Sequence, residues 1–152
     1  MNVIWFVALL STALAMGAAL AHALALPNKI SLAADQYFII QQIYAGWDML
    51  AFLLLIEFAS LIALAGNTEA VARRFILASI VCLIAAQAMF WMFTYPANVA
   101  TRNWTTIPAD WASLRIRWEY SHLAGAAFQV SCMAFLICAT LVKGREGMAR
   151  TG

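Results

Sequence analysis

Four long apolar runs, separated by short polar segments, dominate the chain. They cover residues 3–26, 47–65, 75–97 and 121–142. A helix needs about 20 residues to cross a hydrocarbon core of about 30 Å. Within that core each peptide group must be hydrogen-bonded inside its own segment, so the runs must be helices. The pattern therefore predicts an all-α, four-helix transmembrane bundle that forms a single domain over residues 1–152.

Two of these helices are expected to begin before their apolar runs. Ser31 is a candidate N-cap for the second helix, because residues 32–65 contain no proline and only one glycine. Thr106 or Ile107 is a candidate cap for the fourth, with Pro108 in its first turn and Asp110 beside the positive helix end. We expect helices over residues 3–26, 32–65, 74–97 and 107–143. The second and fourth would then extend about 15–20 Å beyond the membrane on one side.

The composition agrees with a membrane protein. Hydrophobic residues make up 65% of the chain and charged residues 11%, against roughly 25% charged in an average soluble domain. So few charges exclude an ordinary soluble enzyme, and no cluster of Lys and Arg supports binding to nucleic acid. The three cysteines, Cys82, Cys132 and Cys138, lie in apolar runs. We expect them to be small core residues rather than disulfides or zinc ligands.

The basic residues indicate an orientation. The second loop and the C-terminal tail carry five of them: Arg73, Arg74, Lys143, Arg145 and Arg150. The first and third loops carry four: Lys29, Arg102, Arg115 and Arg117. This difference favours both termini in the cytoplasm, in a bacterial inner membrane. The first run ends near a possible cleavage site at Ala21-His22-Ala23, but no Lys or Arg precedes the run, so we expect a retained helix.

Polar and aromatic residues recur at helical spacing near one membrane boundary. The stripes are Trp111, Arg115, Trp118 and His122 in the fourth helix, Tyr37, Gln41, Tyr44 and Asp48 in the second, and Gln87, Trp91, Tyr95 and Asn98 in the third. His22 lies about one turn before the outer end of the first helix, and Gln129 continues the stripe of His122 inward. Together they predict a polar and aromatic pocket at the outer end of the bundle.

The charged residues near this pocket have alternative interpretations. Asp48 either supplies a functional carboxylate or pairs with Arg115 or Arg117. Arg115 and Glu119 have the spacing of an i,i+4 ion pair. Glu57 lies nine residues past Asp48, about 180° round the helix. It therefore meets another neighbour, joins a subunit interface or is protonated, since an ionised side chain in a bilayer seldom faces lipid.

The segments YPAN at 95–98 and PADWASLRIRWEYSH at 108–122 resemble the anthrone oxygenase-like family of small four-helix membrane proteins. The resemblance rests on the order Asn, Asp-Trp, Leu-Arg, Arg-Trp and His before the last helix. It implies an activity seen in fungal relatives, in which O₂ oxidises a polycyclic anthrone to an anthraquinone without an evident cofactor. The residues at family-type site positions are Asn98, Trp111, Arg115, Trp118 and His122.

The expected function is therefore a cofactor-independent oxygenase that acts on a flat aromatic or lipophilic small molecule from the lipid bilayer. His122 or Asp48 would be the base, and Arg115 and Asn98 would stabilise the enolate. The expected substrate-binding residues are Trp111, Trp118, Tyr44, Gln41, Tyr95, His22 and Glu119. No cofactor is expected for this chemistry.

Two alternatives stay open. His22 and His122, at matched depth on two helices, could ligate a b-type haem or a metal ion, which would make the chain a redox protein. Alternatively the chain is a non-catalytic small subunit of a larger membrane complex or a homo-oligomer, with Glu57 at the contact.

Overall fold

Four long helices form the body of the computed structural model, which describes residues 2–149 and the side chains up to residue 144. They are α1 (Asn2–Lys29), α3 (Leu50–Gly66), α4 (Ala70–Met89) with its continuation to Ala100, and α6 (Trp111–Ala149). Each is long and apolar enough to cross a membrane. The predicted all-α bundle is confirmed, and its four apolar helices indicate a multi-pass membrane protein.

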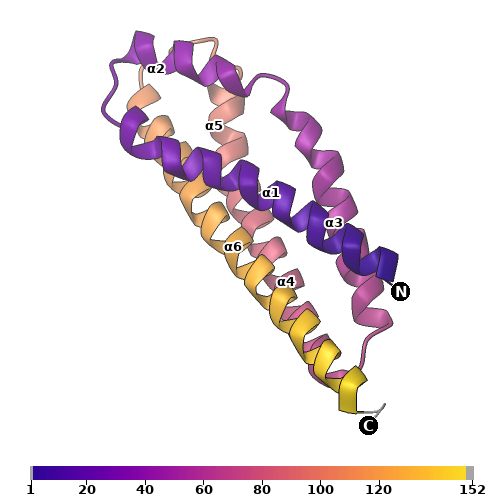
Figure 1. The fold of residues 1–152 in the computed structure, drawn as a ribbon. Coiled ribbons are helices and arrows are strands. Elements are labelled where there is room, and N and C mark those ends of the chain that lie inside the picture. The colour runs from indigo at the N-terminus through magenta and orange to yellow at the C-terminus, as the bar shows by residue number, and fades with distance from the viewer. Residues whose placement is uncertain (1, 150–152) are drawn as a thin grey trace.

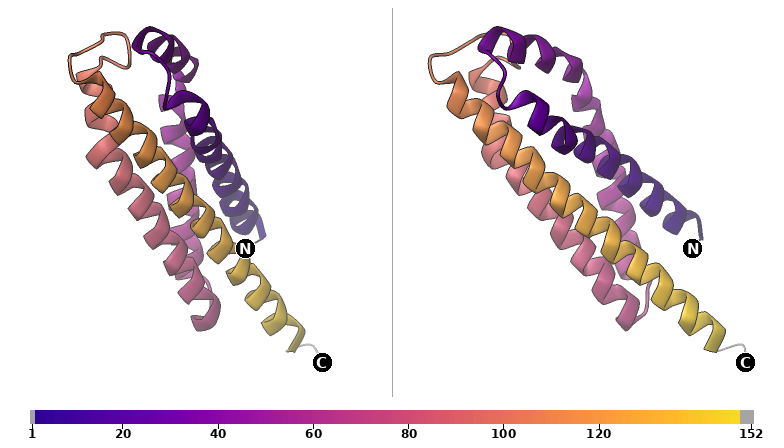
Figure 2. Two further views of the ribbon diagram at one scale, coloured as in Figure 1. Left: turned by 90° about the vertical axis from the view of Figure 1, so that its left-hand side faces the viewer. Right: turned by 60° about the vertical axis from the view of Figure 1, so that its left-hand side comes forward.

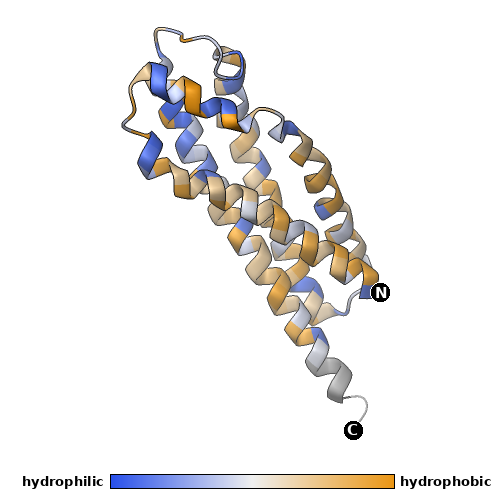
Figure 3. Ribbon diagram, turned by 45° about the horizontal axis from the view of Figure 1, so that its top comes forward, coloured by the Kyte–Doolittle hydropathy of each residue, from blue (hydrophilic) through white to orange (hydrophobic). Residues whose placement is uncertain are grey.

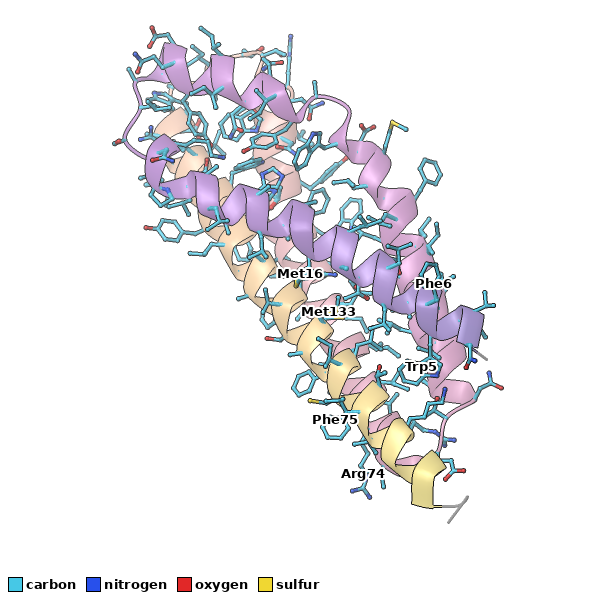
Figure 4. All side chains as sticks on the ribbon, in the orientation of Figure 1. Trp5, Phe6, Met16, Arg74, Phe75 and Met133 are labelled. Atoms are coloured by element: carbon cyan, nitrogen blue, oxygen red, sulfur yellow. The ribbon has the colours of Figure 1, made fainter. Side chains whose placement is uncertain are left out.

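The helices surround a common core. α6 packs against both α1 and α4, and α3 packs against the same two helices from the other side. Large apolar side chains cover the outside of the bundle, and neighbouring residues on α1 show the pattern: Phe6 is 64% exposed, whereas Trp5 is 6% exposed. Figure 4 shows both side chains near the start of α1. Many large apolar side chains thus face outward, as expected for a protein surrounded by lipid.

Short helices cover one end of the bundle. Figures 1 and 2 show α2 (Ala34–Gln41) lying across this end, while both ends of the described chain lie at the opposite end. Figure 3 shows hydrophilic residues gathered around α2 and the nearby loop. The turn between α3 and α4 lies with the chain ends, and Figure 4 shows Arg74 there. Of the basic residues assigned to that side, Arg150 and the side chain of Arg145 lie outside the described part of the chain.

The prediction of one continuous helix over residues 32–65 is wrong. After α2 the chain forms two short 3₁₀ turns, η1 (Gln42–Tyr44) and η2 (Trp47–Met49), before α3 begins. Gly46 lies between the two turns with φ +83°, a left-handed conformation that favours glycine. The α2 segment does extend past the apolar run, as predicted. However, it turns at Gly46 and crosses the bundle end instead of continuing the axis of α3.

The third span runs further than residues 74–97 and contains an irregularity. A π-helical turn, η3 (Phe90–Thr94), joins α4 to α5 (Tyr95–Ala100), with Pro96 in the first turn of α5. A π turn shifts the register of everything that follows. The predicted common face of Gln87, Trp91, Tyr95 and Asn98 is therefore wrong. Trp91 is 59% exposed and Tyr95 is 47% exposed, whereas Asn98 is half-buried.

The fourth helix begins at Trp111, four residues later than predicted, so Pro108 and Asp110 precede it. The loop before it contains three consecutive residues with positive φ, namely Arg102, Asn103 and Trp104. Such a left-handed run costs about 1–2 kcal/mol per residue. It reverses the chain and carries the Trp104 side chain, which is 4% exposed, into the bundle end.

Two apolar clusters form the core. The cluster nearer the chain ends consists of Trp5, Ala8, Leu61, Leu64, Ile76, Leu83, Cys132, Leu136 and Ala139. The cluster beneath α2 consists of Tyr37, Phe38, Ala97, Trp104, Leu114 and Trp118. Of the three cysteines expected in the core, Cys132 is buried, Cys82 is half-buried and Cys138 is exposed. The second cluster supports the polar centre described next.

Candidate functional site

Two histidines from different helices pack against each other near the end of the bundle that α2 covers. The ring centroids of His22 on α1 and His122 on α6 are 4.3 Å apart. His122 Nδ1 lies 2.9 Å from the carbonyl oxygen of Trp118. Because a carbonyl oxygen can only accept, Nδ1 carries the hydrogen, and Nε2 of the neutral ring has a free lone pair. His122 can therefore accept a proton at Nε2.

Aromatic rings enclose the histidine pair. The His22 ring lies 4.2 Å from Tyr44, 5.0 Å from Trp47 and 5.2 Å from Trp118 between ring centroids. The ring of His122 lies 3.9 Å from that of Trp118. Three rings thus reduce contact with water and offer flat apolar faces next to the imidazoles.

A buried ion pair adjoins the rings. Lys29, at the end of α1, places its Nζ 3.0 Å from Oε1 of Glu119 on α6, and the side chains are 4% and 0% exposed. The same Nζ donates to the Tyr44 hydroxyl at 3.2 Å. It also lies 4.8 Å from the ring centroids of both Tyr44 and Trp118. The ammonium group thereby contacts two of the rings that surround His22.

Tyr37 ties α2 to this ion pair. Its hydroxyl donates to Glu119 Oε1 at 2.8 Å and accepts a hydrogen bond from the Gln41 amide. The Tyr37 side chain is fully buried. Burial raises the pKa of the Tyr37 hydroxyl, and the adjacent Glu119 carboxylate raises that pKa further. The Tyr37 hydroxyl therefore stays protonated at neutral pH and donates a hydrogen bond to Glu119.

Asn98 holds two tryptophans in place. Its Oδ1 accepts hydrogen bonds from Trp104 Nε1 at 3.0 Å and from Trp118 Nε1 at 2.9 Å. The backbone nitrogen of Trp104 also donates to the Thr101 hydroxyl at 3.1 Å. With its oxygen occupied in this way, Asn98 positions the wall of the site.

Arg115 has a structural connection to the loop after α1. Its Nη1 donates to the carbonyl oxygen of Leu32 at 2.7 Å, and its guanidinium lies 4.6 Å from the ring centroid of Trp111. The predicted i,i+4 ion pair between Arg115 and Glu119 is not formed, because Lys29 takes that place. Arg115 thereby holds the segment before α2 against α6.

Several buried polar atoms of this cluster have no hydrogen-bond partner among the described residues. They are His22 Nδ1, Gln41 Oε1, Glu119 Oε2 and, in the wall of the site, Arg115 Nε. Buried polar groups are normally paired, so unpaired ones call for an explanation such as a polar ligand or an ordered water. Their concentration around the histidine pair is typical of a binding site.

An open apolar groove lies beside the cluster. It has a volume of about 320 Å³ and is lined by Ala18, Gly46, Trp47, Met49 and Leu50. Trp47 both lines this groove and contacts His22. The Trp47 side chain therefore lies between the groove and His22.

Most of the residues predicted for the site are found together. His22, His122, Trp118, Tyr44, Gln41 and Glu119 belong to the centre, and Asn98, Arg115 and Trp111 support its walls. Asp48 does not join them. It follows the break at Gly46 and is exposed, and among the described residues it pairs with neither Arg115 nor Arg117. Tyr95 is also outside the centre, because it faces away with Trp91 after the π turn.

Two members of the site, Lys29 and Trp47, were missed from the sequence. Lys29 was counted only as a loop charge, although it lies seven residues after His22 and shares its helix face once α1 is continued past Pro27. Trp47 directly follows the glycine that breaks the helix. Helical spacing could have revealed Lys29 but not Trp47. Trp104, which the sequence suggested as part of an aromatic wall together with Trp111 and Trp118, does pack against Trp118.

Glu57 is remote from this site. Its side chain is 0% exposed, and Gln129 on α6 donates to its Oε1 at 2.6 Å. A partner within the chain, one of the alternatives for Glu57, is observed. A residue so enclosed offers no surface for a subunit contact.

The geometry brings together a free imidazole nitrogen, a buried ammonium group and stacked aromatic faces. These groups suit proton removal from a flat apolar molecule and stabilisation of the anion that results. No family model, no curated protein and no solved structure matches this chain.

Proposed function

We propose that this protein is a membrane oxygenase that uses O₂ to oxidise a flat, lipophilic carbon acid of the anthrone type. The observation that carries the proposal is the His122 ring, whose Nε2 is free and which packs among the rings beside His22. The resemblance of residues 95–98 and 108–122 to the anthrone oxygenase-like family supports the same chemistry.

The reaction converts a methylene between two aromatic rings into a carbonyl. His122 Nε2 takes one methylene proton, and the carbanion, delocalised as an enolate, reduces O₂ to a carbon-bound peroxide anion. This anion takes the proton back from His122 and becomes a hydroperoxide. Loss of water from the hydroperoxide completes the oxidation. Overall both C–H bonds and the O–O bond break, while one C=O bond and two O–H bonds form. The substrate loses four electrons, and O₂ gains them.

Lys29 is proposed as the group that stabilises the enolate oxygen. It is the buried cation nearest the rings around His22, since it contacts both Tyr44 and Trp118. Of the residues assigned this role from the sequence, Asn98 accepts from two indoles through its oxygen. Arg115 donates from Nη1 to Leu32, and its Nε has no partner among the described residues. Both residues are proposed as positioning residues instead.

The groove beside Trp47 is the proposed point of entry. Its volume of about 320 Å³ is at the lower end of the range of small-molecule sites. Its apolar lining suits a molecule that dissolves in the bilayer. Substrate would reach His22 by displacement of the Trp47 side chain.

The test is O₂ uptake by the protein in lipid nanodiscs with anthrone as the substrate, against empty nanodiscs. We expect His122→Ala to lower the rate at least about 100-fold, as for loss of a general base. Circular dichroism and size-exclusion chromatography check that the variant is folded. Full activity in folded His122→Ala would reject the proposal.

Asp48→Asn distinguishes the two bases that the sequence suggested. Because Asp48 is exposed and separated from the centre by Gly46, we expect this variant to keep the activity of the unmodified protein. If Asp48→Asn is inactive while His122→Ala is active, the roles must be reversed.

A haem or metal centre at His22 and His122 is a second proposal, favoured by the free Nε2 of His122. His22 and His122 would hold the metal through their ring nitrogens. Their ring centroids are 4.3 Å apart, so the rings would have to separate to admit a metal ion between them. A Soret band, or one metal ion per chain in purified protein, would establish this alternative.

We further propose a bacterial inner membrane, with both termini in the cytoplasm. The support is the excess of Lys and Arg on the side of the chain ends. Fusions of alkaline phosphatase and of a fluorescent protein to the C-terminus test the orientation, because the phosphatase is active only outside the cytoplasm. An active phosphatase fusion would reverse the proposed orientation.

A further inference from the structure

A second polar cluster lies in the bundle interior, away from the histidine pair. Glu57 is near the middle of α3 and is 0% exposed. Its Oε1 accepts a hydrogen bond from Gln129 Nε2 at 2.6 Å and lies 3.6 Å from Cys132 Sγ. Both partners belong to α6, so the carboxyl group links α3 to α6 within the apolar core.

No positively charged side chain among the described residues pairs with this carboxyl group. Within the part of the chain whose side chains are described, the ion pair involves Glu119 and Lys29, not Glu57. The titratable groups around Glu57 are thiols: Cys132 from α6, and Cys82 of α4 behind it. An ionised carboxylate here would be a buried charge without a counter-ion, which is among the least favourable arrangements in a protein.

The second carboxyl oxygen is unpaired. Glu57 Oε2 has no hydrogen-bond partner among the described residues, and neither has the hydroxyl oxygen of Thr12. Thr12 belongs to α1, is 0% exposed and lies beside Glu57. The Thr12 hydroxyl can donate to Oε2 or accept from a proton bound there, and a small movement would close either bond. The same proton would remove the buried charge.

We propose that Glu57 is a proton-binding site within the membrane, at which a neutral carboxylic acid joins α1, α3 and α6. Oε1 accepts from Gln129, while the acid O–H on Oε2 is directed to Thr12. The ligand of this site is a proton, which Glu57 acquires when α3 enters the bilayer. The inference does not depend on the proposed oxygenase activity.

Glu119 provides a control inside the same protein. It too is 0% exposed, but it is paired with Lys29 and accepts a hydrogen bond from Tyr37. Burial is thus equal at the two glutamates, and Glu119 has a counter-ion, whereas Glu57 has none among the described residues. A reagent selective for buried, protonated carboxyl groups should separate them.

Dicyclohexylcarbodiimide is such a reagent. The acid proton moves to a carbodiimide nitrogen, and the carboxyl oxygen bonds to the central carbon. The acyl group then shifts to nitrogen, giving a stable N-acylurea that retains all atoms of both reactants. The experiment treats the full chain in nanodiscs at pH 7 and maps the adducts by peptide mass spectrometry.

We expect adducts at Glu57 at least tenfold more abundant than at Glu119. They should disappear in Glu57→Gln, which keeps the shape and remains folded. Equal labelling of Glu57 and Glu119 would overturn the proposal. Protection of Glu57 by Na⁺ at constant pH would also overturn it, because the site would then bind a metal cation.

A second measurement tests the proposal even if dicyclohexylcarbodiimide does not reach Glu57. Infrared spectra of unlabelled protein should contain a carboxylic acid C=O band that is lost in Glu57→Gln. Glu119→Gln should leave this band in place. Identical acid bands in the unmodified protein and Glu57→Gln would overturn the proposal, whatever the labelling result.

Discussion

Lys29 and Glu119 form an ion pair of 3.0 Å although both side chains are almost fully buried, at 4% and 0% exposed. We expect removal of either partner, by Lys29→Met or Glu119→Gln, to lower the free energy of unfolding by about 3–5 kcal/mol, because an unpaired buried charge or an orphaned partner remains. Unfolding in mixed detergent, followed by circular dichroism, measures the loss.

The double variant Lys29→Met/Glu119→Gln is the control for this prediction. It removes both charges together, so its loss should be much smaller than the sum of the two single losses. Strictly additive losses would mean that the two side chains do not interact.

The Tyr37 hydroxyl makes the free energy of unfolding depend on pH in the alkaline range. Its pKa is raised by burial and by the Glu119 carboxylate, whereas the unfolded chain titrates near pH 10. The contribution of Tyr37 is therefore complete below about pH 10. It is lost as pH rises further, because the unfolded chain releases a proton that the folded chain retains.

We expect Tyr37→Phe to remove this part of the pH dependence, which amounts to up to about 1.4 kcal/mol per pH unit above pH 10. Unfolding curves of the two proteins at pH 8, 10 and 11 measure it. Parallel pH profiles for the unmodified protein and Tyr37→Phe would show that the hydroxyl titrates normally.

Regular helices made much of the site predictable. Trp118 and His122 are four residues apart on an uninterrupted α6, so their common face followed from spacing alone. His22 was matched to His122 by its depth in the membrane. Both inferences hold because a straight helix preserves direction and register over many turns.

Backbone irregularities explain what could not be predicted. Gly46 takes a left-handed conformation, which turns Asp48 away from the stripe of Tyr37 and Gln41. The π turn at 90–94 does the same to Tyr95. In each case a local change in the backbone hydrogen bonds shifted the register of the residues that follow. The spacing of hydrophobic residues in the sequence does not reveal such a shift.

The turn at Gly46 gives a prediction with a matched control. Gly46→Ala should destabilise the protein by about 1–2 kcal/mol, the cost of a left-handed residue with a Cβ. Apart from the adjoining residues, no atom lies within 4 Å of the added Cβ, so a clash with another part of the chain does not contribute. Gly17→Ala also meets no atom within 4 Å, but Gly17 is helical, and this change should be neutral or stabilising by up to about 1 kcal/mol. Equal effects of the two substitutions would contradict the conformation of Gly46.

Asn98 supports the wall of the candidate site, and its loss should be measurable. Its Oδ1 accepts from the indoles of Trp104 and Trp118, which are 4% and 3% exposed. Asn98→Leu leaves two buried N–H groups unpaired, at about 1–3 kcal/mol each, and should lower the unfolding free energy and change tryptophan emission. Asn67→Leu is the control, since Asn67 is exposed and bonds only the Ala63 carbonyl. Asn98→Asp keeps an acceptor oxygen, so this variant should lose less stability than Asn98→Leu. If Asn98→Leu loses as little stability as Asn67→Leu, the two indoles do not depend on the Asn98 side chain.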